Sequence, residues 1–239
     1  MRADDPAYVA DQYATEDGLV ARSTIYGPAP FDARDIVVEE ISRLDHPRVL
    51  EVGCGWGELA VRLEHEAHAS VAGVDLSPRM VELARRRGVD AVVGDVQELD
   101  HPDGFFDAVV AAWMLYHVPD LDRALATIAR VLRPGGVLVA TTNAADDFSE
   151  LWELVGRDLS DREQTFRSEN GAEHLKRHFA RVRRRDLSGP VTFAGGAAIR
   201  SYVGSTTRGR ALLEEMDDRD LDRTLEATKR VSVFVAEKA

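Results

Sequence analysis

Cysteine is nearly absent from this chain, and long apolar runs are absent altogether. Cys54 is the only cysteine among 239 residues, so no internal disulfide framework can form. No apolar stretch approaches the roughly 20 residues that span a bilayer, and the first residues lack the apolar core of a signal peptide. These absences predict a cytoplasmic protein without a membrane segment.

Positive charge is also in short supply. The chain has 30 Lys and Arg against 42 Asp and Glu, a net charge of −12 at pH 7. This balance disfavours broad attraction to nucleic acid. One basic patch runs against it, formed by Lys176, Arg177, Arg181 and residues 183–185. We interpret the patch as the solvated face of a helix and a strand edge, with binding of an anionic substrate as the alternative.

Strand and helix patterns alternate from Arg48 onwards. Strands are expected at 48–52, 70–75, 90–93, 106–112 and 136–142, and helices between them at 58–66, 78–87 and 120–131. Such alternation predicts right-handed β-α-β units and a parallel sheet covered by helices on both faces.

The flanking segments are less regular. Before the core, helices are expected at 6–14 and 31–44. After Thr142, helices are expected at 148–158, 171–179, 196–203 and 209–228, and strands at 181–187 and 231–236. A last strand reached after such an interruption can lie antiparallel in the sheet.

The most informative segment runs from Val49 to Ala60. An apolar strand containing Glu51 leads into three glycines at alternate positions, and an amphipathic helix begins near Glu58; the glycines are Gly53, Gly55 and Gly57. Glycine permits positive φ and close approach of the backbone to a ligand, and we expect free N–H groups of the turn to face a crevice. The spacing is G-x-G-x-G, whereas a dinucleotide site of the G-x-G-x-x-G type needs its third glycine where Glu58 stands.

Suitable residues follow the next three strands as well. Ligands of open α/β sheets bind outside the carboxyl ends of the strands. Asp75 lies about 20 residues beyond the glycines, where a carboxylate can accept hydrogen bonds from ribose hydroxyls. His117 follows the fourth strand, and its ordinary pKa near 6.5 suits a general base; a structural histidine bonded to backbone is the alternative.

Taken together, the glycine loop and the segments 74–78, 94–99 and 112–120 resemble class I, seven-strand, Rossmann-like methyltransferases that depend on S-adenosyl-L-methionine (SAM) and act on small molecules. The resemblance covers about residues 46–145. It implies a mostly parallel seven-stranded sheet with helices on both faces in a single domain. Residues 1–45 would form an N-terminal helical lid, 46–145 the SAM-binding core, and 146–239 a C-terminal half with a helical cap before the last strand.

The resemblance also implies the site residues. The cofactor would be held by Tyr13, Glu51, Gly53, Cys54, Gly55, Gly57, Asp75, Leu76, Asp95, Val96, Gln97, Ala112 and Trp113. Asp95 occupies the position that recognises adenine, and Tyr13 would pack on the cofactor from the lid. His117 and Tyr26 would act on the acceptor, which Arg22, Tyr26 and His117 would bind. No metal is implied.

The expected reaction is methyl transfer to an oxygen or nitrogen of a small-molecule acceptor. Such an enzyme works mainly by proximity and orientation, which can lower a barrier by about 7–11 kcal/mol, so it needs no covalent nucleophile. Two classes of alternative stay open. One is an RNA-modifying methyltransferase that uses the basic patch. The other is a protein that binds a different nucleotide, either a binding module without catalysis or an NAD-dependent oxidoreductase. The sequence predicts neither the acceptor nor the oligomeric state.

Overall fold

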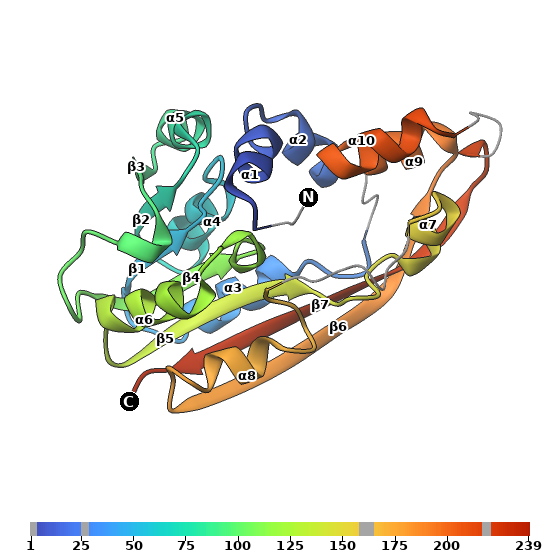
Figure 1. Ribbon diagram of the computed structural model, residues 1–239. Helices are drawn as coiled ribbons and strands as arrows, with labels where there is room; N and C mark the ends of the chain where they lie inside the picture. The colour runs from blue at the N-terminus through green and yellow to red at the C-terminus, as the bar shows by residue number, and fades with distance from the viewer. Residues whose placement is uncertain (1–3, 25–28, 158–164, 217–220) are drawn as a thin grey trace.

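A seven-stranded sheet forms the centre of the computed structural model, which describes residues 4–24, 29–157, 165–216 and 221–239 (Figure 1). The strands are β1 (Arg48–Val52), β2 (Ser70–Asp75), β3 (Asp90–Val93), β4 (Phe106–Ala112), β5 (Leu132–Asn143), β6 (Arg181–Phe193) and β7 (Leu225–Glu237), in the order β3-β2-β1-β4-β5-β7-β6. Strands β1 to β5 pair in parallel, and β7 is antiparallel to both β5 and β6. The predicted sheet and its antiparallel last strand are confirmed.

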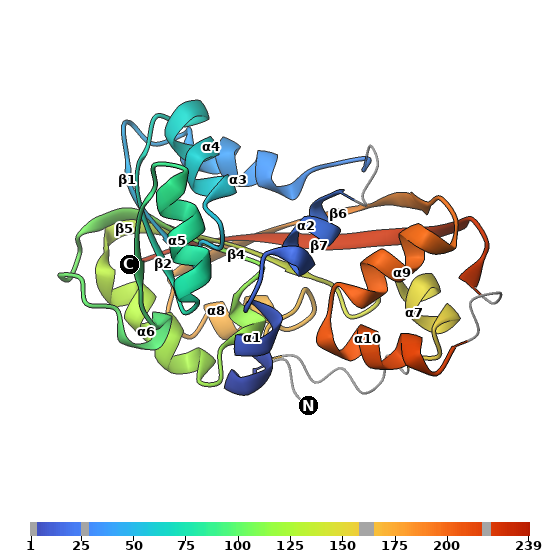
Figure 2. The same cartoon turned by 90° about the horizontal axis from the view of Figure 1, so that it is seen from above.

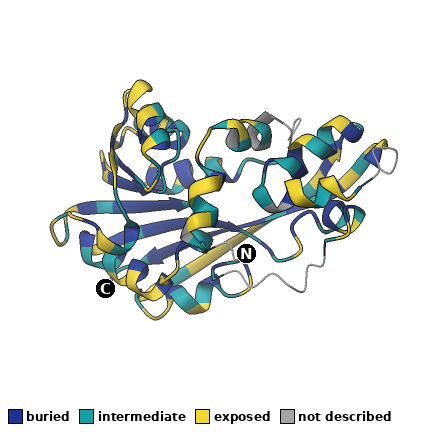
Figure 3. Cartoon of the chain, turned by 45° about the horizontal axis from the view of Figure 1, so that its top comes forward, coloured by how far each residue is buried: buried dark blue, intermediate teal, exposed yellow. Residues whose placement is uncertain are grey.

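Helices cover both faces of this sheet (Figure 2). On one face α3 (Ala33–Ile41), α4 (Glu58–Glu66) and α5 (Pro78–Arg86) share a core cluster with β1 and β7. On the other face α6 (Leu121–Val131) and α8 (Gly171–Leu175) pack against β4 and β5. The buried side of α6 repeats with helical spacing, at Leu121, Ala124, Leu125, Ile128 and Val131. Dark buried strands between partly exposed helices show these layers in Figure 3.

Four further helices gather beyond the carboxyl ends of the parallel strands. These are α1 (Pro6–Gln12), α2 (Asp17–Thr24), α9 (Gly196–Gly204) and α10 (Thr207–Glu214), and α1 and α2 lie between α5 and the α9–α10 pair (Figures 1 and 2). A third core cluster joins α9 to α7 (Ser149–Leu154) and to the ends of β6 and β7. The N-terminal helices α1 and α2 therefore meet helices α9 and α10 beyond the carboxyl ends of the parallel strands.

The C-terminal predictions were partly wrong. The helix expected at 209–228 ends at Glu214, and β7 already begins at Leu225. The two last strands are also longer than predicted, because they pair continuously as antiparallel neighbours, from Arg181 opposite Glu237 to Phe193 opposite Leu225. Pairing between the strands determines their length, and the local sequence pattern of a charged segment does not indicate such pairing.

The basic patch lies on the surface of β6 and next to α8. Arg183 pairs with Glu40 at 3.2 Å, and Arg185 pairs with Glu39 at 3.2 Å. Both ion pairs are exposed on the arginine side, as the solvated interpretation predicts. Within the described ranges, none of the helices has the length and hydropathy that a membrane crossing requires.

Candidate active site

A cavity of about 820 Å³ opens at the carboxyl ends of the parallel strands. Its volume lies toward the upper end of the range of about 300–1,000 Å³ for small-molecule sites. Most of the predicted site residues line it, namely Tyr13, Glu51, Gly53, Cys54, Gly55, Asp75, Leu76, Asp95, Val96, Gln97, Ala112, Trp113 and His117. Gly57 does not line the cavity; it precedes α4 with a φ of 81°.

The glycine loop takes the left-handed backbone that its composition predicts. Gly53 has a φ of 66°, and a Cβ there would lie 2.7 Å from Cβ of Met114. Several of the loop's N–H groups, which we expected to be free, are hydrogen-bonded within the protein. Gly53 and Cys54 donate to the Val74 carbonyl at 2.7 and 3.1 Å. The loop is therefore tied to the end of β2, which fixes the floor of the cavity.

Two carboxylates expected to bind an adenosine are held in place by local hydrogen bonds. Asp75 accepts from the N–H groups of Gly55 at 2.8 Å and Ser77 at 2.9 Å. Asp95 precedes the short helix η1 (Val96–Glu98) and accepts from the Gln97 N–H at 2.8 Å. The Gln97 side-chain amide also donates to both oxygens of Asp95, at 3.1 and 2.9 Å. Because each carboxylate oxygen has two lone pairs, both groups can still accept a further hydrogen bond.

Glu51 is the most perturbed acid of the site. Its side chain is buried, and within the described part of the chain its Oε2 has no hydrogen-bond partner. Burial raises the pKa of Glu51 to about 8, and the nearby charge of Asp75 adds to the rise. Burial also raises the pKa of Asp75. A buried acid beside a half-buried one favours a cationic ligand, so the orphaned oxygen of Glu51 fits the ammonium group of SAM.

His117 ends the short helix η2 (Leu115–His117), directly after β4. Its Nε2 lies 3.0 Å from the hydroxyl of Tyr13, and the two rings meet edge to face. The Tyr116 ring lies 4.4 Å from the imidazole. The structure thus joins the predicted lid residue to the predicted base.

The segment after α1, which we predicted to form a lid, is attached to the side of the cavity that contains the glycine loop. Ser77 Oγ donates to the Tyr13 carbonyl at 3.0 Å, and Arg79 pairs with Glu16 at 2.8 Å. Ser77 also caps α5, with Pro78 at its first position, as the sequence predicts. These contacts hold the segment after α1 against the start of α5.

Helix α1 is also attached to helices α9 and α10. The buried side chain of Gln12 donates to the Ser205 carbonyl at 3.0 Å and accepts from the Thr207 N–H at 3.2 Å. Helix α1 therefore bridges the cofactor half and α9–α10, and Tyr13 is positioned from both sides.

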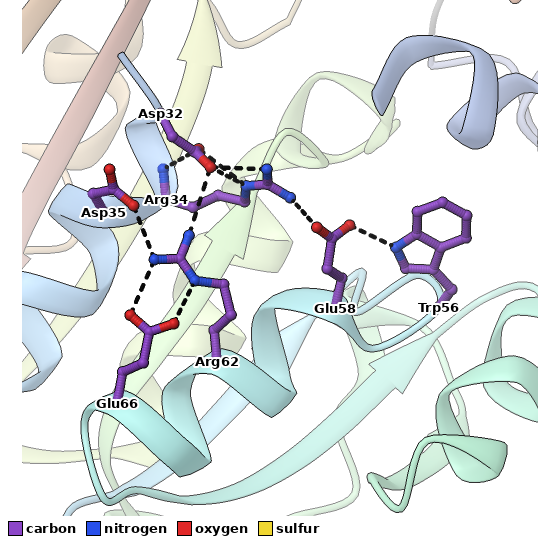
Figure 4. A network of polar contacts seen from close by, with 7 residues as sticks. All are labelled: Asp32, Arg34, Asp35, Trp56, Glu58, Arg62 and Glu66. Atoms are coloured by element: carbon purple, nitrogen blue, oxygen red, sulfur yellow. Dashed lines mark hydrogen bonds and ion pairs between the residues drawn. The ribbon is translucent and has the colours of Figure 1, made fainter. Parts of the chain in front are cut away.

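A polar network borders the glycine loop (Figure 4). Arg34, near the start of α3, lies 2.6 Å from Glu58 and 2.8 Å from Asp32. Glu58 in turn accepts from the Trp56 indole at 3.1 Å. Arg62 and Glu66 extend the network along α4, with Asp35 on the α3 side. The network joins α3 to the loop and brings Arg34 to the cavity wall.

Two predicted acceptor contacts are not described by the structure. Tyr26 lies outside the described residues, and Arg22 lies in α2 with a side chain that is not described. Other cavity residues were missed by the sequence reasoning. Asn143 is the last residue of β5, a position that strand topology indicates, and it accepts from the Trp113 indole at 2.9 Å. Arg34, Tyr202 and Lys229 also line the cavity, and no local motif marks them.

Comparison with known proteins gives consistent results. Residues 50–140 match the family model described as a methyltransferase domain. The chain is 36% identical over 141 residues to 27-O-demethylrifamycin SV methyltransferase of Amycolatopsis mediterranei, an alignment that covers 55% of this chain and 47% of that one. It is 34% identical over 129 residues to a ubiquinone biosynthesis O-methyltransferase of Alkalilimnicola ehrlichii, covering 51% and 52%. The chain spans about half the length of these curated relatives.

The fold has solved counterparts as well. Phosphoethanolamine N-methyltransferase 2 of Haemonchus contortus, in complex with SAM, superposes with a TM-score of 0.64 at 17% identity, covering 100% of this chain and 60% of that one. At that identity the likeness concerns the fold alone. The family match falls on β1 through most of β5, where the glycine loop, Asp75, Asp95 and His117 lie. Residues 50–140 are therefore similar to a methyltransferase domain in sequence, and the sheet that contains them has a Rossmann-like fold.

Proposed function

We propose that this protein transfers the methyl group of SAM to an oxygen or nitrogen of a small-molecule acceptor. The observation that carries the proposal is the pairing of two features in one cavity. One end holds the buried Glu51 and the half-buried Asp75 beside the glycine loop, and the same cavity contains the Tyr13–His117 pair. The two relatives described above, whose names state O-methylation or methylation, support this class of reaction.

Each strand end has one task in this proposal. Glu51 receives the ammonium of the methionyl part, Asp75 the ribose hydroxyls, and Asp95 the adenine amino group. Bound SAM supplies an electrophilic methyl group on its sulfonium. The chain's contribution is to align the acceptor with that methyl group and to exclude water. Orientation of this type can lower the activation barrier by about 7–11 kcal/mol.

Tyr13 and His117 provide a route for the acceptor's proton. A hydroxyl acceptor must lose a proton as its oxygen gains the methyl group. The Tyr13 oxygen can accept that proton while its own proton passes to His117 Nε2, 3.0 Å away. Charge is then balanced by the imidazolium, and no covalent intermediate is needed. General base catalysis of this type contributes about 10²- to 10⁴-fold in rate.

The rest of the chain would supply substrate choice. We assign 1–45 to a lid, 46–145 to the cofactor core, and 146–239 to a C-terminal half whose helices cap the acceptor. The RNA-modifying alternative loses support because Arg183 and Arg185 of the basic patch pair with glutamates.

A labelling experiment tests the proposal. Incubation with methyl-labelled SAM and a panel of phenols, carboxylic acids and amines should give a labelled small molecule with at least one class. Asp75→Ala should reduce turnover strongly, and Asp45→Ala, a change of an exposed aspartate before β1, should not. Tight SAM binding without transfer to any acceptor would favour a binding module instead, and label found in RNA would favour the RNA enzyme.

A further inference from the structure

Asn143 brings a side-chain amide to the cavity from the carboxyl end of β5. It is the last residue of that strand, it is only partly buried, and it lines the same cavity as His117. From its geometry we propose that Asn143 orients the methyl acceptor by donating a hydrogen bond from Nδ2 to an oxygen of that molecule. This inference rests on the proposed methyltransferase function and names a specificity residue for it, together with the chemical feature that this residue recognises.

The Trp113 indole determines which way the amide points. Its Nε1 lies 2.9 Å from Oδ1 of Asn143. An indole nitrogen can only donate, whereas a side-chain amide has one accepting oxygen and one donating nitrogen. The contact therefore requires the amide oxygen to face Trp113, and the two N–H groups of Nδ2 are left for another partner. Among the residues that the structure describes, none accepts a hydrogen bond from this nitrogen.

Both residues of this pair are held firmly. Trp113 has a φ of 52°, a left-handed conformation that is strained for a bulky residue, and its N–H donates to the Thr141 carbonyl at 3.0 Å. The Asn143 backbone pairs with Val231 of β7, and its carbonyl accepts from the Ser168 N–H at 3.2 Å. Backbone strain of this type persists where the surrounding structure imposes it, and it gathers at binding sites. The amide is thus fixed in direction before a ligand arrives, as specific recognition requires.

Strand order places Asn143 away from the predicted cofactor carboxylates. Glu51 lies on β1, Asp75 ends β2, and Asp95 lies shortly after β3. In the sheet, β4 separates these three strands from β5, and the segment after β4 contains His117. Asn143 therefore lies one strand beyond β4, on the side of the cavity where we propose that the acceptor binds.

An amide nitrogen of this kind recognises an oxygen other than the reacting atom. A hydrogen bond donated to the lone pair of a nucleophile makes that pair less available for the methyl group. The partner of Nδ2 is therefore a second oxygen of the acceptor, such as a carbonyl oxygen. The amide carries no charge, so it selects its partner by hydrogen bonding and direction rather than by ionic attraction.

Binding of matched probes to the full chain saturated with S-adenosylhomocysteine (SAH) tests this inference. The probes are 3′- and 4′-hydroxyacetophenone, each compared with the isopropenylphenol of the same substitution, in which a CH₂ group replaces the carbonyl oxygen. Calorimetry at pH 8 should show that at least one ketone binds about 3-fold or more tightly than its alkene, since a neutral hydrogen bond is worth about that much. The better of the two ketones indicates the spacing between the hydroxyl and the second oxygen.

Variants then assign the preference to the amide nitrogen. Asn143→Asp keeps an oxygen for the Trp113 indole but replaces the N–H donors by a carboxylate oxygen, so it should abolish the preference for the ketone. Asn143→Leu removes the donors without adding charge and should do the same. Ser70→Asp, which adds the same charge at an exposed position at the amino end of β2, should keep the preference.

The melting temperature and SAH affinity of each variant separate loss of the acceptor contact from loss of the fold or of the cofactor site. Both should stay close to those of the natural protein in at least one Asn143 variant. Equal binding of ketone and alkene in both pairs, no binding of any probe, or an unchanged preference in a folded Asn143 variant would each overturn the inference. A loss of SAH affinity in both folded variants would also overturn it, because Asn143 would then belong to the cofactor site. Failure of SAH to bind the natural protein would instead overturn the proposed function.

Discussion

Glu51→Gln should change how the stability of the ligand-free protein depends on pH. The pKa of Glu51 is about 8 in the folded chain, against an ordinary value of 4.5 that we take for the unfolded chain. Between these values the folded state binds more protons than the unfolded state. Stability from this group is therefore fully present below about pH 4.5 and is lost as the pH rises toward 8.

The magnitude follows from the difference between the two pKa values. At 1.36 kcal/mol per pH unit, a rise from 4.5 to about 8 corresponds to about 5 kcal/mol. Above pH 8 an ionised Glu51 weakens the ligand-free fold by that order, whereas a glutamine of the same shape has no charge to bury. We expect Glu51→Gln to be more stable than the natural protein at pH 8.5, with the advantage shrinking toward pH 5.

Urea denaturation of both proteins at pH 5.5, 6.5, 7.5 and 8.5 measures this difference. Glu153→Gln, a change of an exposed glutamate in α7, serves as the matched control and should follow the natural protein. Parallel stability curves for the natural protein and Glu51→Gln would refute the reasoning. The same substitution should weaken SAH binding, because the ammonium loses its carboxylate; improved stability together with unchanged SAH affinity would remove Glu51 from the binding site.

Three shorter predictions concern neighbouring residues. Gly53→Ala should lower the free energy of unfolding by about 1–3 kcal/mol, because alanine at a φ of 66° is strained and its Cβ would meet Met114; a loss under half of this in urea denaturation would contradict the loop geometry. Burial, then the Glu51 and Asp75 charges, raise the pKa of the Cys54 thiol, so iodoacetamide at pH 8 should label it far more slowly than in urea. Equal rates would disprove its burial. Tyr13→Phe should lower kcat for a hydroxyl acceptor about 10²-fold or more with unchanged SAH affinity, and an unaltered kcat and pH–rate profile would exclude the relay.

The core of the fold could be predicted because its signals are local. Apolar strands, glycine punctuation and helical spacing all lie within short windows between Arg48 and Thr142. The predicted cofactor residues share this property: Asp75 ends β2 and Asp95 lies shortly after β3, at strand ends that we expect to face the ligand. Their acceptor capacity toward the cavity was therefore predictable, while the tethering of the loop N–H groups to Val74 depends on tertiary contact.

The acceptor half was harder to predict because its residues come from distant segments. Tyr13 meets His117 across 104 positions, which no local pattern encodes. Lys229 reaches the cavity only because β7 pairs antiparallel with β5, and the sequence had placed the preceding residues in a helix. Long-range pairing of this type shapes the side of the cavity where we propose that the acceptor binds, and it explains why the acceptor itself could not be named from motifs.

The central claim is that the corner after β1 binds the amino-acid end of SAM, while Asp75 binds its sugar. Titration calorimetry with SAH and the full chain tests this most directly. We expect one site per chain with a dissociation constant in the micromolar range or tighter, weakened at least about 10-fold in Asp75→Ala and unchanged in Asp45→Ala. The absence of binding heat across several temperatures, or equal affinity in Asp75→Ala, would contradict it.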